Sequence, residues 1–107
     1  MKIIGEFQEM YNNKYGELLP KFKSMVTVYN DDEKQFILNY LKSGTVISAA
    51  AGTAKDVLTN EKIPGEWLLL TDGVFSWGTD TIYYFEKYNI DLGRDFLDYL
   101  KNKLAMH

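Results

Sequence analysis

Cysteine is absent from this chain of 107 residues, and its one histidine is His107. Without cysteine the chain has no disulfide, no thiolate nucleophile and no zinc ribbon or CxxC redox pair. A lone histidine leaves no Ser/His or Cys/His dyad and no site with several histidine ligands. These absences exclude the commonest nucleophilic and metal-dependent enzymes, and we expect no catalytic residue, no metal site and no cofactor.

Long apolar runs are missing as well. No segment approaches the roughly 18 apolar residues that a membrane-spanning helix requires. The opening stretch MKIIGEFQEM lacks the apolar core of a secretory signal. We therefore expect a soluble, cytoplasmic protein without membrane contact. The length and the ordinary composition predict one globular domain over residues 1–107.

Charge is nearly balanced overall, with 12 basic against 15 acidic side chains and a net charge of −3. The acidic excess is concentrated in residues 66–98, which hold seven acids against Lys87 and Arg94. The same segment holds half of the aromatic side chains. An acidic, aromatic surface repels phosphate backbones and attracts cationic groups. We therefore expect no nucleic-acid binding and favour a protein partner with a basic surface.

Local patterns predict an α+β fold, in which a small antiparallel sheet packs against about four helices. The expected elements are helices over about 3–13 and 31–43, strands at 45–48 and 55–59, a hairpin over 67–77, a helix that begins near residue 79, and a final helix over about 92–104. Residues 14–29 fit either a short helix after Pro20 or a loop that leads to a strand at 25–29.

Two of these elements have specific local signals. Asn30 and Glu33 have the spacing of a capping box at the start of helix 31–43. Asp72 and Gly73 join two apolar runs, and this dipeptide is typical of hairpin turns because both residues tolerate a positive φ. We therefore assign Asp72 to a turn rather than to acid/base chemistry.

The small-residue run around Gly52 is where the backbone could approach a ligand closely. It lacks the first glycine and the Gly-Lys pair of a phosphate-binding loop, so a tight turn or close packing competes with a ligand site. A pocket beside Gly52, with Trp77 and Asp80 in its wall, is the alternative interpretation, and it predicts a small-ligand-binding domain or a simple enzyme.

Two tyrosines and three aspartates form the candidate partner surface. Tyr84 and Tyr88 lie one helical turn apart and off the apolar face of their expected helix, so an interface role and a half-buried structural role both stay open. Asp91, Asp95 and Asp98 lie at i, i+4 and i+7. This stripe is either a solvated helix face or a contact for a cationic partner.

A family resemblance is carried by residues 68–100, LLLTDGVFSWGTDTIYYFEKYNIDLGRDFLDYL. They resemble the C-terminal part of a group of small bacterial proteins of unknown function. The shared pattern is a TDG turn, an aromatic strand that ends in tryptophan, an acid at the start of a helix and three tyrosines; the matching residues include Trp77, Asp80, Tyr83, Tyr84 and Tyr88. The next helix here begins with Leu-Gly, where the group has Leu-Pro. Such proteins are often encoded beside secreted toxins, so the resemblance implies an immunity-type protein but no particular site residue.

The leading hypothesis is a non-enzymatic protein-interaction domain. In its sharper form it is an immunity-type protein that binds a basic toxin, such as a nuclease, or another cationic partner. The alternative is the ligand pocket described above. A third possibility is self-association through apolar surface.

Overall fold

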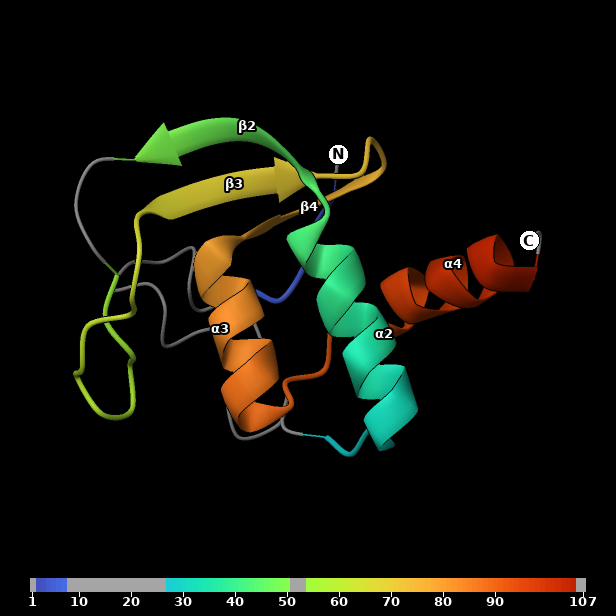
Figure 1. Cartoon of the computed structure of the whole chain (residues 1–107), viewed down its shortest axis with the longest axis horizontal. Helices are drawn as coiled ribbons and strands as arrows, with labels where there is room; N and C mark the ends of the chain where they lie inside the picture. The colour runs from blue at the N-terminus through green and yellow to red at the C-terminus, as the bar shows by residue number, and fades with distance from the viewer. Residues whose placement is uncertain (1, 8–26, 51–53, 106–107) are drawn as a thin grey trace.

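The fold combines one sheet with three helices in the residues described by this computed structural model, which are 2–7, 27–50 and 54–105. The elements in chain order are β1 (Lys2–Ile3), α2 (Asp31–Lys42), β2 (Thr45–Ala50), β3 (Trp67–Thr71), β4 (Phe75–Gly78), α3 (Thr79–Tyr88) and α4 (Arg94–Ala105). Figure 1 shows α2 and α3 beside each other below the sheet. The predicted α+β class is confirmed.

The sheet is mixed, with the strand order β1-β4-β3-β2. β2, β3 and β4 are antiparallel, whereas β1 is parallel to β4. The backbone N–H of Ile4 donates to the carbonyl of Ser76 at 2.9 Å and extends this parallel pairing. The prediction of a purely antiparallel sheet is therefore wrong. A parallel partner far away in sequence leaves no local turn signal.

The described residues hold three helices rather than about four. The expected helix 3–13 begins instead as strand β1, followed by Gly5 with a φ of 75°. A Cβ at Gly5 would collide with the side chain of Thr81, so the approach of this segment to α3 requires glycine. Residues 8–13 of that prediction lie outside the described part of the chain.

Two other expectations concern short segments. The strand expected at 55–59 is reduced to a single bridge between Lys55 and Lys62. Most of segment 14–29 lies outside the described residues, and its described end, 27–29, is neither helix nor strand. Within the described chain, neither 55–59 nor 27–29 lies beside a strand of the sheet that could complete a ladder of hydrogen bonds.

Helix α2 begins as the capping signal predicts. The side-chain oxygen of Asn30 accepts a hydrogen bond from the backbone N–H of Glu33 at 2.7 Å, and acids fill the first turn. The inner face of the helix buries Ile37, Leu38 and Leu41. The ammonium group of Lys34 donates to the carbonyl of Glu86 at 2.8 Å and ties α2 to α3.

Asp72 shapes the turn between β3 and β4. Its Oδ1 accepts from the backbone N–H groups of Val74 and Phe75 at 2.9 and 2.8 Å. Its Oδ2 accepts from the hydroxyl of Tyr40 at 2.5 Å, which links the turn to α2. Gly73 has a φ of 96°. The turn role assigned to Asp72 is confirmed.

Trp77 lies at the centre of the hydrophobic core, fully buried on β4. Its indole N–H donates to the carbonyl of Leu41 at 2.9 Å, and its ring lies 5.9 Å from that of Phe96 on α4. One side chain thus joins the sheet to two helices. Burial of an indole is favourable here because its N–H has a partner.

Candidate functional site

Tyr84, predicted as a contact residue, is buried with 1% of its surface exposed. Its hydroxyl accepts from the N–H of Val57 at 3.0 Å, and its ring packs edge-on to Phe7 at 4.9 Å. Burial raises the pKa of Tyr84 to about 12. The ring is therefore not exposed, because Phe7 and the 54–63 loop cover it, and Tyr84 fits the structural one of the two roles left open.

Tyr88 is half-buried and belongs to a polar cluster around Asp56. The hydroxyls of Tyr88 and Tyr83 donate to Asp56 Oδ2 at 2.6 and 2.8 Å. The ammonium of Lys87 lies 3.6 Å from the same oxygen and 5.4 Å from the centre of each tyrosine ring. Tyr88 therefore contributes its hydroxyl to the inside of the protein rather than to a free surface.

Asp56 is a buried carboxylate that the sequence prediction missed. Its Oδ1 accepts from the backbone N–H groups of Leu58 and Thr59 at 2.8 and 3.2 Å. Burial by itself would raise the pKa of Asp56, but hydrogen bonds from Tyr88, Tyr83 and these two N–H groups lower it to about 2. Both oxygens are satisfied, so the carboxylate fastens the loop to α3 and is not poised as a base. An aspartate in a turn is the only local sign of this role.

The aspartate stripe does not form one surface. Asp91 precedes α4, which begins only at Arg94, so helical spacing does not relate it to the other two. Asp95 pairs with Lys2 at 2.8 Å, and Asp98 lies 3.7 Å from Arg94. All three aspartates are exposed, and Asp91 borders the groove between α2 and α4.

The described residues do not form the alternative ligand pocket. Gly52, which was predicted to lie beside it, is outside the described part of the chain. Trp77 is fully buried in the hydrophobic core. Asp80 Oδ1 accepts from the indole N–H of Trp67 and the backbone N–H of Thr81, both at 3.0 Å, and burial raises its pKa. The hollow beside Asp80 holds about 10 Å³, which is scarcely room for one water molecule.

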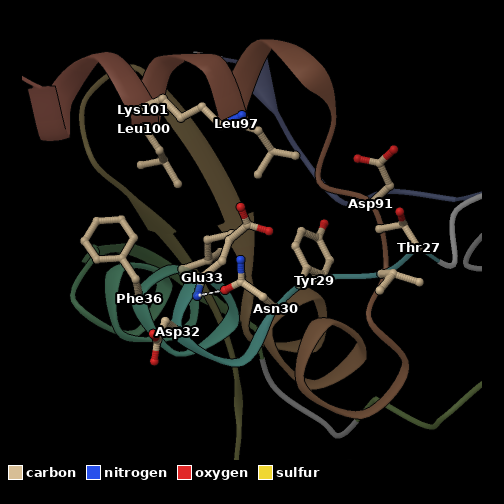
Figure 2. Close-up of a pocket in the computed structure, with 12 residues that line it drawn as sticks. Thr27, Tyr29, Asn30, Asp32, Glu33, Phe36, Asp91, Leu97, Leu100 and Lys101 are labelled. Atoms are coloured by element: carbon tan, nitrogen blue, oxygen red, sulfur yellow. Dashed lines mark hydrogen bonds between the residues drawn. The ribbon is translucent and has the colours of Figure 1, made fainter.

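A groove of about 540 Å³ lies between α2, α4 and the segment that leads into α2. Its apolar lining consists of Val28, Tyr29, Phe36, Ile37, Leu97 and Leu100. Figure 2 shows the two leucines pointing from α4 across the hollow. Val28 is 90% exposed and Phe36 is 38% exposed. Apolar groups that could anchor a partner are therefore open to solvent here.

The charged lining of this groove is mostly acidic. It consists of the carboxylates of Asp32, Glu33 and Asp91 and the ammonium group of Lys101. Figure 2 places Glu33 in the middle of the hollow and Asp91 at its end beside Thr27. We call the groove lined by these apolar and charged residues the acidic groove. An apolar floor with a negative rim suits a cationic partner that carries an apolar anchor.

The wall of the acidic groove is held by Tyr29. Its hydroxyl donates to the carbonyl of Ile90 at 2.9 Å, and its ring packs against that of Phe85 at 5.2 Å. Burial raises the pKa of Tyr29 to about 12, so the ring stays neutral. The wall is therefore fixed to α3 and to the segment that follows it.

A second hollow, of about 480 Å³, lies beside the β3–β4 turn. Its walls include Tyr40, Asp72 and Lys103, and the ammonium of Lys103 donates to the Tyr40 hydroxyl at 3.2 Å. Burial opposes the charge on Asp72, but the Tyr40 hydroxyl and the turn N–H groups lower its pKa. These groups already satisfy one another, so the hollow offers no free catalytic pair.

Within residues 2–7, 27–50 and 54–105, no group of three or more acidic or histidine side chains could hold a metal ion. None of the helices in these ranges is long and apolar enough to cross a membrane. No family model, curated protein or solved structure matches this chain.

Proposed function

We propose that this protein is a non-enzymatic interaction domain and that the acidic groove binds a basic segment of a protein partner. The observation that carries the proposal is the apolar groove, in which Val28 and Phe36 are exposed beside three carboxylates. In such an interface, an apolar anchor supplies most of the affinity. The surrounding carboxylates raise the association rate and select against acidic partners.

The sharper form of the proposal is an immunity-type protein that acts in the bacterial cytoplasm and blocks a basic toxin. It is supported by the resemblance of residues 68–100 and by the sign of the groove's charge. Of the partner contacts predicted from the sequence, only Asp91 lies in the proposed site. The sharper form requires that a gene for a secreted, basic protein lies beside the gene for this chain. Inspection of the genomes that encode this chain therefore tests it.

The binding proposal is tested with a synthetic peptide of about 12 residues that alternates leucine and lysine pairs. Glu33→Gln and Asp91→Asn together remove two rim charges without changing side-chain size. The Asn oxygen can still accept the bond that Asp91 Oδ1 receives from the Gly93 N–H at 2.9 Å. We expect the double variant to bind the peptide about threefold to tenfold more weakly at low salt, as measured by fluorescence anisotropy, and the difference to shrink at high salt.

The matched control is Asp95→Asn with Asp98→Asn, which removes the same charge from exposed positions outside the groove. We expect its affinity to stay within about twofold of the unchanged protein. A peptide with glutamate in place of lysine should not bind. Equal losses in both double variants would show that net charge alone attracts the peptide, and would contradict a groove site.

A further inference from the structure

Both long walls of the acidic groove are helices, α2 and α4. The side chains that line these walls include a set at i, i+3 and i+4 on each helix: Glu33, Phe36 and Ile37 on α2, and Leu97, Leu100 and Lys101 on α4. Residues at this spacing form one ridge along a helix surface. Figure 2 shows Leu97 and Leu100 on the α4 side of the hollow and Phe36 on the α2 side. The groove is thus bounded by two helical ridges, and the ridge of a further helix fits between such ridges.

The backbone of a bound segment needs hydrogen-bond partners as well as a surface for its side chains. Inside α2 and α4 the backbone N–H and C=O groups bond to one another, so the two helices do not offer an open edge to a strand. An extended segment that lay between them would bury its own peptide groups against apolar side chains without partners. A helix pairs these groups internally and can turn an apolar face into the groove.

We propose that the partner segment binds the acidic groove as an amphipathic helix with one apolar face flanked by lysine or arginine, an inference that rests on the function proposed for the groove. A helix of about 12 residues is too short to be stable by itself in water. The segment is therefore largely unfolded when free and becomes helical when its apolar face meets the groove.

Charge complementarity determines where the basic side chains of the bound helix lie. The groove has the carboxylates of Asp32, Glu33 and Asp91 and the ammonium group of Lys101. Figure 2 places Asp91 and Lys101 toward opposite ends of the hollow. Lysine or arginine on the bound helix is therefore favoured near Asp91 and Glu33, while its apolar face packs against the leucines of α4.

Two peptides with the same length and the same content of leucine and lysine test the proposal on the full chain. In one, leucine and lysine alternate in pairs, which gathers the leucines on one side of a helix. In the other they alternate singly, which gathers the leucines on one side of a strand. We expect the paired peptide to bind about tenfold more tightly in fluorescence anisotropy. The difference circular dichroism spectrum of its complex should show added helix.

A proline in the paired peptide gives a second test that leaves the protein unchanged. Proline in place of one central lysine breaks the helix, whereas alanine at the same position removes the same charge and keeps the helix. We expect the proline peptide to bind about tenfold more weakly than the alanine peptide. Equal affinities of these two peptides would overturn the helical partner.

The outcomes separate the shape of the partner from the site itself. Suppose that the singly alternating peptide binds as tightly as the paired one, and that Glu33→Gln with Asp91→Asn still weakens it. The helix would then be overturned, and the groove would remain a site for an extended segment. If this double variant weakens neither peptide, the function proposed for the groove fails and the helical partner fails with it.

Discussion

Single residues decide where the 54–63 loop lies, and Asp56 is the clearest case. Its carboxylate receives two tyrosine hydroxyls and two backbone N–H groups while its side chain is completely buried. The sequence offered only an aspartate in a segment that we expected to form a short strand. Its partners on α3 are 27 and 32 residues further along the chain, and the fold alone brings them together.

Replacing Asp56 should therefore cost much more stability than replacing an exposed aspartate. Asp56→Ala leaves the hydroxyls of Tyr83 and Tyr88 and two N–H groups without their acceptor, so we expect a loss of about 3 kcal/mol in the free energy of unfolding. Asp98→Ala, at an exposed site, should change it by less than about 0.5 kcal/mol. Urea unfolding followed by circular dichroism measures both. Similar values for the two variants would contradict the anchoring role.

The same hydrogen bonds predict how stability depends on pH. The pKa of Asp56 is about 2 in the folded protein and near its ordinary value of 3.8 in the unfolded chain. Its contribution is fully present above about pH 4 and is lost as the pH falls toward 2. Asp72, whose pKa is also lowered, acts in the same direction.

The contribution of Asp56 can be isolated with Tyr88→Phe. Loss of the Tyr88 hydroxyl should raise the pKa of Asp56 in the folded state, so the variant should lose less stability than the unchanged protein between pH 4 and pH 2. Urea midpoints at several pH values measure the difference. Identical pH profiles would show that the Tyr88 hydroxyl does not stabilise the charged carboxylate.

Among the elements, those with local signals follow the sequence and those with distant partners do not. Helix α2 has its cap and its apolar face within a dozen residues, and the β3–β4 turn has Asp72. In contrast, β1 exists only because β4 supplies a parallel neighbour, which periodicity along the chain cannot reveal. The start of α3 combines both kinds of signal, because Asp80 lies in its first turn and bonds to Trp67 on β3.

The junction between β4 and α3 depends on the glycine at position 78. A Cβ at Gly78 would collide with Asp80 Oδ1 and lie 2.9 Å from the indole nitrogen of Trp67. We expect Gly78→Ala to lower the free energy of unfolding by about 1–3 kcal/mol. Adding Trp67→Phe should cost less than the sum of the two single changes, because the smaller ring makes room for the methyl group. Strictly additive costs in urea unfolding would contradict this contact.

The proposed binding site belongs to the molecule as a whole. Three separate segments line it, from 27 to 37, at Asp91 and from 97 to 101. The sequence indicates an acidic character but places it mainly in residues 66–98. Of the acids in that segment, only Asp91 lines the groove, while Asp32 and Glu33 come from residues 1–43, in which acidic and basic side chains balance. Composition could predict the sign of the charge, but the packing of α2 against α4 determines which carboxylates meet.

The most direct test of the central claim is a nuclear magnetic resonance titration of isotope-labelled protein with the leucine–lysine peptide at low salt. We predict amide shifts confined to residues 27–37, Asp91 and 97–101, and no shifts with the glutamate peptide. Shifts centred on β2 or on the β3–β4 turn, or none at all, would contradict the assignment of the acidic groove as the partner-binding site.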